Sequence, residues 1–352
     1  MPQIPTIQPA ALGDLFPVFD RLEAGESIAL TNGDDIRELL PSPAEPGPWL
    51  GVQSSGSTGR PKLFWRPWTR LKQEVRDHST VRGWTWASPF CPSSFAGVQV
   101  ALQTYATGGK VVGLDVDWPA NWRRLFMEKV DAVSCTPTFL DLLIQNEQET
   151  SRGYHPVHIT LGGEPLRASL GSRLRCRFAP TSFTVVYAAA EFGVLLKTHR
   201  LDGWYELPAL HKRHPGWRLS EQGELEICQD GHWRGTGDRV ELQSGLARVT
   251  GRCDEVANVG GTKVSLTQVA EFAEAVPGIR RAVAFAEDNA IAGQIVGLRF
   301  QVEEGKSVVE VQNRLEENLR RQLRKEAWPR KWIAEPIDLG PNAKRASHLM
   351  GT

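Results

Sequence analysis

The sequence predicts an α/β protein: a large domain of mostly parallel sheets flanked by helices, with a small β subdomain, followed by an α+β C-terminal domain. With 352 residues, the chain exceeds the usual size of one compact core. Residues 98–165 alternate strand-like and helix-like segments, which indicates a parallel sheet covered on both faces. Residues 200–250 change to short segments separated by Gly and Asp, typical of antiparallel strands. We therefore place the domains at 1–250 and 251–352.

The first half of the chain gives a signal for each element in turn. Residues 12–24 predict a short helix, and the Pro-rich stretch 41–48 predicts a loop. Interleaved aromatic and basic residues from Trp68 to Arg82 favour an amphipathic surface helix. Further on, we expect helices at 98–107, 121–130 and 139–148, and strands at 108–116, 131–137 and 157–163.

The C-terminal domain has two helix starts of the same kind. Ser265 and Gln268 stand at the spacing of a capping box and predict a helix through about Val276. Ser307 and Glu310 repeat this spacing before a second helix. Its apolar positions are Val311, Leu315, Leu319 and Leu323. Strands are expected between the helices, at 280–288 and 294–304.

Composition excludes several classes of function. Lys plus Arg and Asp plus Glu number 41 each, so the chain has no general attraction for polyanions, and we expect no nucleic-acid partner. No apolar run is long enough to cross a membrane, and the first residues lack the pattern of a secretory signal. The five scattered cysteines form no CxxC pair, which favours reduced thiols in the cytoplasm and argues against a zinc site.

One short stretch, SSGSTGRPK at 54–62, combines the residue types that bind phosphate. Its glycines let backbone N–H groups converge on an anion, and Lys62 adds a charge. Gly56 and Gly59 are too close for a Walker A loop, and Leu63 follows the lysine where that loop needs Ser or Thr. The residues alone leave a solvated linker as an open alternative. The hydroxyl donors are Ser54, Ser55, Ser57 and Thr58.

Four further motifs follow this stretch in order: VYAAAEFG at 186–193, GTGD at 235–238, GRCDEVANVGGTKV from 251, and GPNAKRASHL from 340. The stretch at 54–62 resembles the phosphate loop of the adenylate-forming superfamily. The four further motifs resemble, in the same order, its Y-G-x-T-E motif, its T-G-D motif, its G-R-x-D segment with a Gly-Gly loop, and its N-G-K-x-x-R ending. This superfamily includes acyl- and aryl-CoA synthetases, peptide-synthetase adenylation domains and luciferases. The resemblance runs from about residue 51 to the end.

The resemblance implies a reaction in two steps. The carboxylate of an acid would attack the α-phosphate of ATP, giving an acyl-adenylate and pyrophosphate. The acyl group would then move to the thiol of CoA or of the phosphopantetheine on a carrier protein. The implied substrate is a small carboxylic acid, and the implied cofactors are ATP, Mg²⁺ and one of these thiols.

Five charged residues match positions with a role in the first step. Lys62 and its loop would neutralise the pyrophosphate, and Glu191 would hold Mg²⁺, which prefers carboxylate oxygen. Asp238 would accept the ribose hydroxyls, with Arg252 supporting the ribose or a phosphate. Lys344 would bridge the carboxylate and the α-phosphate oxygens.

Other matching residues surround these. Tyr187 would stack on adenine, and the ATP site would be completed by Ala188, Gly163 and Glu164. The acid would lie among small and apolar residues, namely Phe95, Ala96, Gly97, Thr136, Gly162 and Ala189. The tunnel for the thiol arm would be lined by Gly260, Gly261 and Lys263. Asp254 matches the hinge about which a mobile C-terminal domain rotates.

Structural alternatives remain open for several of these residues. Tyr187 suits a protein core, and Asp238 suits a turn after Gly-Thr-Gly. Residues 162–164 suit a simple turn at the end of a strand. Lys344 suits a solvated tail, and Glu191 suits an exposed turn.

The sequence also departs from the superfamily pattern. Alanine replaces the usual glycine at 188 and 343 and the usual threonine at 190, which puts the rate in question more than the reaction. Only about fifty residues precede the phosphate loop, so the acid pocket must be closed differently, for which a homodimer is one solution. Ala96 stands where amino-acid-activating members place an aspartate, so we expect an aryl or medium acyl acid.

Two functions compete on this sequence. The first is an AMP-forming acid–thiol ligase, which the retention of Lys344 and the Gly-Gly loop favours. The second is a catalytically impaired module that binds a nucleotide or acyl-adenylate and acts with a partner. An unrelated kinase-like enzyme is disfavoured because neither a Walker A loop nor a kinase loop set is present.

Overall fold

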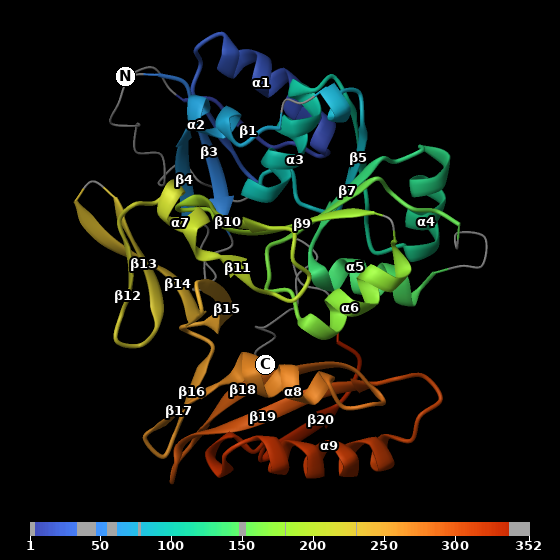
Figure 1. The fold of residues 1–352 in the computed structure, drawn as a ribbon, viewed down its shortest axis with the longest axis vertical. Coiled ribbons are helices and arrows are strands. Elements are labelled where there is room, and N and C mark those ends of the chain that lie inside the picture. Colours follow the sequence, from blue (N-terminus) through green and yellow to red (C-terminus); the bar gives the residue numbers. More distant parts are fainter. Residues whose placement is uncertain are drawn as a thin grey trace. The chain divides into compact units, whose positions relative to one another are not determined.

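The structure is a computed structural model that describes residues 4–33, 47–54, 62–76, 79–147, 153–179, 181–229 and 231–337. The chain forms two compact units, one with the described residues up to Leu201 and one with those from Asp202 (Figure 1). The predicted hinge at Asp254 lies inside the second unit and stays a prediction. No described helix is both long and apolar enough to cross a membrane.

The first unit begins with a sheet in the order β1-β2-β3-β4, with bounds Thr6–Ile7, Ile28–Leu30, Trp49–Ser54 and Lys62–Pro67. β1, β2 and β3 are parallel, whereas β4 runs antiparallel to β3. Ser54 pairs with Lys62 across β3 and β4. The predicted phosphate loop is therefore the connection between two paired strands, and its residues 55–61 lie outside the described residues.

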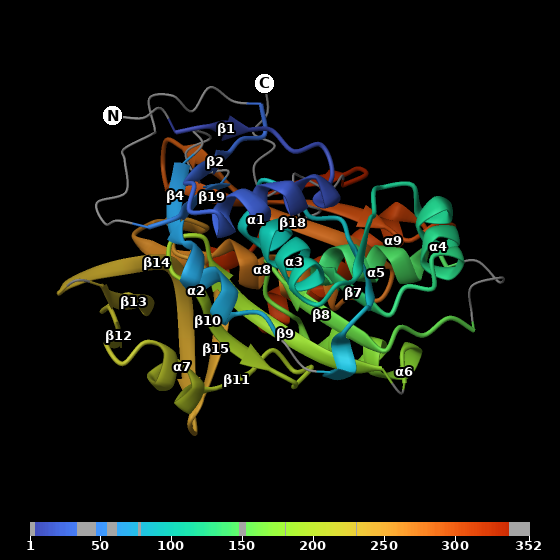
Figure 2. The same cartoon turned by 90° about the horizontal axis from the view of Figure 1, so that it is seen from above.

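Three helices form a core against this sheet: α1 (Phe16–Glu23), which follows a 3₁₀ turn at Leu12–Leu15, α2 (Trp68–Gln73) and α3 (Phe95–Ala106). α1 and α3 lie side by side in both views (Figures 1 and 2). The rings of Phe19 and Trp68 stack with their centroids 5.4 Å apart, and both side chains are buried. The predicted helix at 12–24 is confirmed.

The helix expected from Trp68 to Arg82 is shorter than predicted, because α2 ends at Gln73 and the next described helical element is a 3₁₀ turn at Ser79–Val81. The side chain of Gln103, on α3, hydrogen-bonds both the backbone N–H and the backbone carbonyl of Arg76. Its Oε1 accepts from the Arg76 N–H at 2.8 Å, and its Nε2 donates to the Arg76 carbonyl at 2.9 Å. These contacts occupy groups that a continuing helix would use.

A second sheet has the order β10-β9-β8-β7-β5-β6. Its strands, in chain order, are β5 (Thr85–Ser88), β6 (Lys110–Gly113), β7 (Ala132–Cys135), β8 (His158–Gly162), β9 (Ser182–Ala189) and β10 (Gly193–Thr198). Only β10 pairs antiparallel. The connecting helices are α3, α4 (Trp118–Met127), α5 (Pro137–Gln145) and α6 (Ala168–Arg177). The alternation predicted for 98–165 is confirmed, and the carboxyl ends of β7, β8 and β9 meet at one edge.

The second unit begins with an antiparallel sheet in the order β11-β15-β14-β13-β12. Its elements are β11 (Tyr205–Glu206), α7 (Leu207–Arg213), β12 (Trp217–Leu219), β13 (Glu224–Gln229), β14 (His232–Gln243) and β15 (Leu246–Arg252). Long β14 pairs with both β13 and β15. The antiparallel pattern predicted for 200–250 is confirmed.

The C-terminal part of this unit packs two helices on a sheet. The sheet has the order β17-β16-β19-β18, with β20 beside β19, and its bounds are Val256–Val259 (β16), Thr262–Ser265 (β17), Ile279–Asn289 (β18), Gly293–Val302 (β19) and Lys331–Ala334 (β20). The helices are α8 (Leu266–Glu274) and α9 (Val308–Gln322). Both predicted caps are present: Ser265 accepts from the N–H of Gln268, and Ser307 from that of Glu310. Leu315 and Leu319 of α9 are buried in the core of this part.

His158, the first residue of β8, makes stability depend on pH. Its ring lies 2.7 Å from the Ser182 hydroxyl and 3.1 Å from that of Thr160, and it is 6 % exposed. Burial, together with repulsion from Arg76 and His199, lowers the pKa of His158 from its ordinary 6.5 to about 4. The folded protein thus disfavours the protonated ring that the unfolded chain accepts below pH 6.5.

We expect this residue to remove about 2 kcal/mol of unfolding free energy as the pH falls from 7 to 5. Denaturant unfolding at several pH values measures it, and His158→Gln is the comparison. Because glutamine takes up no proton, the variant should lose less stability over this interval, whatever its stability at pH 7. Equal pH slopes for the two proteins would contradict the assignment.

Candidate functional site

Arg66 on β4 connects three of the predicted site regions. Its Nη2 donates to the carbonyl oxygens of Ala189, at 3.4 Å, and of Ala190. Its guanidinium carbon lies 5.6 Å from the centre of the Phe95 ring. The side chain therefore links the strand after the phosphate loop to the predicted acid pocket and to the β9–β10 turn, which contains Glu191.

Arg66 is a buried cation, 9 % exposed. Burial lowers the pKa of its guanidinium to about 10, against the attraction of Glu191 and with some help from repulsion by Arg70. Its Nε is buried and has no hydrogen-bond partner among the described residues. None of the sequence motifs includes Arg66. The available signal was a charged residue two positions after Phe64, on the strand face that packs into the core.

Several predicted site residues at the ends of the parallel strands stabilise the local fold. The Oε1 of Glu164 accepts from the backbone N–H of Thr138 at 2.8 Å, which joins the end of β8 to the first turn of α5. Thr136 caps the same helix by accepting from the N–H of Phe139 at 3.0 Å. Gly163 has a φ of +85°, which a side chain would strain. A contact of these residues with adenine or the acid stays a prediction.

Two residues of the predicted acid pocket and one of the predicted ATP site are constrained by packing. A Cβ on Gly97 would lie 2.1 Å from the carbonyl oxygen of Cys91, so α3 approaches that loop only with glycine here. A Cβ on Gly162 would lie 3.2 Å from the carbonyl oxygen of Val186. The Tyr187 side chain is buried in β9 at 8 % exposure, which fits the alternative of a core tyrosine, and its stacking on adenine stays a prediction.

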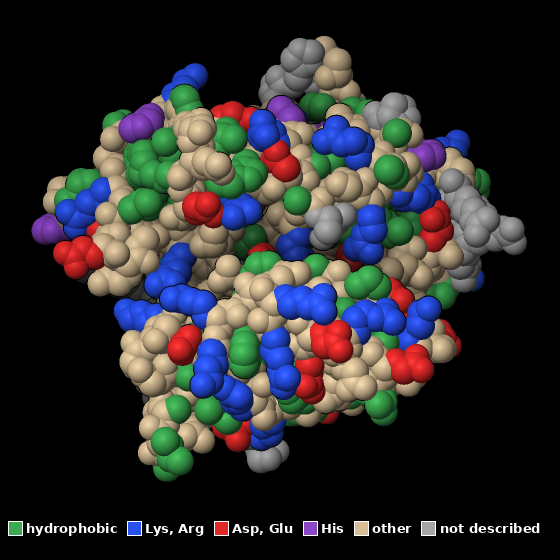
Figure 3. All heavy atoms as spheres, turned by 60° about the horizontal axis from the view of Figure 1, so that its bottom comes forward, with side chains coloured by type: hydrophobic (Ala, Val, Ile, Leu, Met, Phe, Trp, Pro, Cys, Tyr) green, Lys and Arg blue, Asp and Glu red, His purple; other side chains and the backbone are tan. Residues whose placement is uncertain are grey.

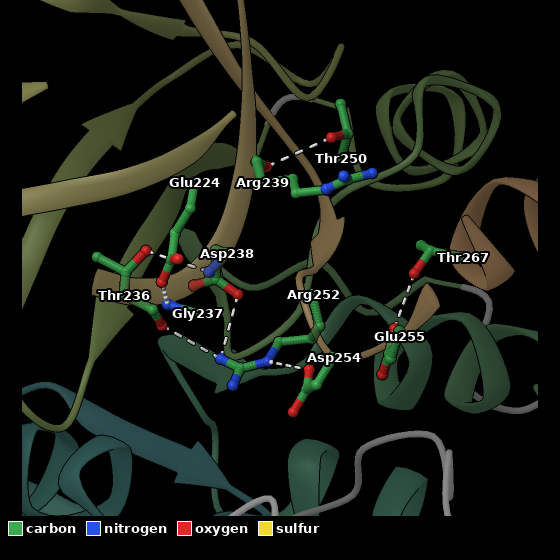
Figure 4. A network of polar contacts seen from close by, with 10 residues as sticks. All are labelled: Glu224, Thr236, Gly237, Asp238, Arg239, Thr250, Arg252, Asp254, Glu255 and Thr267. Atoms are coloured by element: carbon green, nitrogen blue, oxygen red, sulfur yellow. Dashed lines mark hydrogen bonds and ion pairs between the residues drawn. The ribbon is translucent and has the colours of Figure 1, made fainter. Parts of the chain in front are cut away.

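In the second unit, Asp238 and Arg252 face each other across β14 and β15 (Figure 4). The Oδ1 of Asp238 lies 3.3 Å from Nη1 of Arg252, and Arg252 Nε lies 3.2 Å from Oδ1 of Asp254. Arg252 also donates to the Thr236 carbonyl at 3.3 Å. Burial lowers the pKa of Arg252, but the two carboxylates outweigh it and raise the pKa above its ordinary value. The motif carboxylate is thus held by a permanently charged partner.

The glycine of the T-G-D motif is required by this arrangement. Gly237 has a φ of +75°, and a Cβ there would lie 2.6 Å from Nη2 of Arg252. Its N–H donates to Oε1 of Glu224 at 2.8 Å. The guanidinium can therefore lie against the backbone beside Asp238, as Figure 4 shows.

The predicted thiol-arm loop is a tight hairpin turn. Val259 pairs with Thr262, so Gly260 and Gly261 form a two-residue connection between β16 and β17. Their φ values of +57° and +83° match a type I′ turn, which favours glycine at both positions. Turn geometry explains the glycines, and the role of this loop and of exposed Lys263 in a tunnel stays a prediction.

The structure groups the predicted residues incompletely. Ser55, Gly56, Ser57, Thr58, Gly59 and Lys344 lie outside the described residues, as do the side chains of Ser54 and Lys62. Among the described residues, no group of three His, Cys, Asp or Glu side chains is placed to hold a metal ion.

Arg66 should matter for stability through its contacts with the 189–190 turn. We expect Arg66→Met to lower the free energy of unfolding by about 2 kcal/mol, because a buried hydrogen bond from a charged donor contributes roughly 1.5–3 kcal/mol. Arg70→Met is the matched control and should change it by less than about 0.5 kcal/mol. Denaturant unfolding of the three proteins compares them, and equal stabilities for both variants would contradict the role of Arg66.

The chain resembles known proteins in sequence and in fold. Residues 40–228 match the family model of AMP-binding enzymes. The fatty acid–[acyl-carrier-protein] ligase MmaC of Mycobacterium marinum (strain ATCC BAA-535 / M) is 32% identical over 111 residues, which are 31% of this chain and 19% of MmaC. The chain thus spans about a fifth of the length of this curated relative.

Two solved structures show the likeness in fold. ATP-bound MatB from Rhodopseudomonas palustris has a TM-score of 0.67 and 16% identity, over 84% of this chain and 66% of MatB. The anthranilate CoA ligase AuaEII, in complex with anthranoyl-AMP, has a TM-score of 0.69 and 12% identity, over 97% of this chain and 76% of AuaEII. At such identities the likeness shows the fold alone, and it confirms the predicted fold class.

Proposed function

Because the chain belongs to the family of AMP-binding enzymes, within the adenylate-forming superfamily, we propose that it is an AMP-forming acid–thiol ligase. A carboxylate oxygen attacks the α-phosphorus of ATP, and the bond to the leaving pyrophosphate breaks. In the second step a thiol attacks the acyl carbon, its proton passes to solvent, and AMP leaves. The relatives named above include ligases for a carrier protein and for CoA, which supports this reaction class.

The observation that carries the proposal is the ion pair of Asp238 with Arg252 in the T-G-D motif. The neighbouring cation pairs with the carboxylate and holds its position on the strand before any ligand arrives. An ionised carboxylate accepts hydrogen bonds from vicinal hydroxyls such as those of a ribose. We assign the ribose of ATP to Asp238 on this basis.

The remaining assignments follow the motifs. Lys62, at the base of the β3–β4 hairpin, would meet the pyrophosphate, and Lys344 would supply charge to the adenylation transition state. Mg²⁺, when bound at Glu191, would neutralise phosphate oxygens. The acid would lie near Phe95 and Ala189, where Arg66 adds a buried positive charge at the edge of an otherwise apolar set. An aryl or medium acyl carboxylate suits such a pocket.

The first test is acid-dependent exchange of pyrophosphate into ATP across a panel of aryl and acyl acids. We expect exchange with at least one acid, and Lys344→Ala should slow it about 10²- to 10³-fold, as the loss of one transition-state charge typically does. Lys306→Ala, an exposed lysine of the second unit, should leave it unchanged. ATP binding by folded protein without exchange for any acid would instead support the impaired binding module.

A second test concerns the metal. We expect Glu191→Gln to raise the Mg²⁺ concentration for half-maximal exchange about tenfold, because an amide oxygen binds a hard cation less strongly than a carboxylate. Glu221→Gln, at an exposed glutamate in the second unit, is the control. An unchanged Mg²⁺ requirement in the Glu191 variant would overturn this assignment and leave the ligase proposal standing.

A further inference from the structure

Charged side chains of this protein lie mostly at its surface. Figure 3 shows Lys and Arg side chains exposed over one face of the molecule, with Asp and Glu among them. Of all Lys, Arg, Asp and Glu side chains in the described part of the chain, only Arg66 and Arg281 are buried. Burying a cation costs free energy unless the protein supplies its hydrogen bonds. Arg281 donates to the Ile337 carbonyl at 3.0 Å, within the second unit, whereas Arg66 binds a loop that carries a predicted site residue.

This loop, between β9 and β10, has the geometry of a three-residue hairpin connection. β9 ends at Ala189, β10 begins at Gly193, and these two residues pair. The N–H of Phe192 donates to the Ala189 carbonyl at 3.1 Å, and Gly193 has a φ of +80°. The pattern matches a type I turn that ends in a left-handed residue. Glu191 lies within this loop and is exposed, so its carboxylate is open to a cation.

Arg66 holds the loop through a carbonyl that the turn itself leaves free. A type I turn uses only the carbonyl of its first residue, which here is Ala189. Nη2 of Arg66 donates to that oxygen at 3.4 Å and also to the carbonyl of Ala190. The Ala190 carbonyl and the Glu191 N–H belong to one planar peptide unit. A hydrogen bond to this carbonyl therefore fixes the plane from which the Cα of Glu191 extends.

The guanidinium that makes these contacts has a fixed place of its own. Arg66 pairs with Leu50 across β3 and β4, and its guanidinium carbon lies 5.6 Å from the centre of the Phe95 ring on α3. Burial lowers the pKa of Arg66, and the attraction of the Glu191 carboxylate partly offsets this effect. A buried cation, anchored in a sheet and against a helix, thus holds the loop and also attracts the carboxylate that the loop carries.

We propose that Arg66 is the positioning residue of Glu191: it fixes the peptide plane between residues 190 and 191, so that the carboxylate meets Mg·ATP in one orientation. The inference rests on the proposed function, which assigns Mg²⁺ to Glu191. Arg66 itself contacts no ligand in this assignment and acts through Glu191 alone. Because the backbone of the loop is already ordered, binding of the metal pays less conformational entropy than it would on a free loop.

Calorimetric titration of the full chain with Mg·ATP, and with ATP in the presence of EDTA, tests the proposal. We expect Arg66→Met to raise Kd for Mg·ATP about tenfold, as the loss of a group that orients a metal ligand typically does. Its Kd for metal-free ATP should change less than about twofold. Arg281→Met, at the other buried arginine, is the matched control and should alter neither value. Arg66→Lys keeps the charge and one donor, so it should bind Mg·ATP more tightly than Arg66→Met does.

A double-mutant cycle separates positioning from a general structural role. In a Glu191→Gln background, Arg66→Met should raise Kd for Mg·ATP less than about twofold further, because the group through which Arg66 acts is already gone. A purely structural role would give the same fold-change with and without the Glu191 carboxylate. That result would overturn the proposal, as would an unchanged Kd for Mg·ATP in Arg66→Met alone.

Hydrogen exchange of the ligand-free protein measures the loop directly. Leu125→Ala, a truncation of a buried side chain in α4, is the control for lost stability in the same unit. The Phe192 amide should exchange about tenfold faster in Arg66→Met than in this control, since a hydrogen bond from a charged donor is lost beside it. Equal exchange in the two variants would contradict the fixed loop.

Pyrophosphate exchange by the unmodified chain reports the proposed function separately. Exchange by a chain whose Mg·ATP affinity does not depend on Arg66 would sink this inference alone. A tenfold effect of Arg66→Met on Mg·ATP binding, without exchange for any acid, would sink the ligase proposal alone.

Discussion

Parallel pairing of β5, β7, β8 and β9 determines where the predicted site residues of the first unit lie, because parallel strands bring their carboxyl ends to one edge of the sheet. Thr136, Gly162 and Ala189 follow or end three of these strands and so come together from distant parts of the sequence. The buried guanidinium of Arg66 then connects this edge to the other sheet through the carbonyls of residues 189 and 190. Its position makes the β9–β10 turn, which contains Glu191, part of a fixed framework.

In the second unit, the register of antiparallel strands brings the predicted site residues together. Pairing of β14 with β15 sets Asp238 opposite Arg252, and the left-handed backbone of Gly237 leaves room for the guanidinium. The same strand presents Arg239 on its other face, toward a cavity completed by residues from β17 and from the segment after α9. The alternation of side chains along β14 thus places the Asp238 site and this cavity on opposite faces of the strand.

Glycines in this chain show how a motif can have a structural cause beside a functional one. Gly260 and Gly261 fit a two-residue hairpin turn, and Gly97 fits the close approach of α3 to the Cys91 carbonyl. Glu164 likewise bonds the first turn of α5. These contacts would hold the same residues in place whether or not a ligand is bound. Only substitutions that spare the backbone, such as those of Lys263 and Glu191, separate the two causes.

The sequence by itself determined the local elements and the order of the motifs. Helix caps at Ser265 and Ser307, the alternation across 98–165 and the antiparallel run at 200–250 are all set by neighbours a few residues apart, and each appears in the structure. The end of α2 could not be predicted in this way, because the side chain of Gln103, on α3, hydrogen-bonds the backbone N–H and carbonyl of Arg76. Arg66 and the cavity at Arg239 were likewise decided only by tertiary structure. Their partners lie about 25 to 125 positions away in the chain, and pairing over such distances depends on sheet register and packing, which no local pattern encodes.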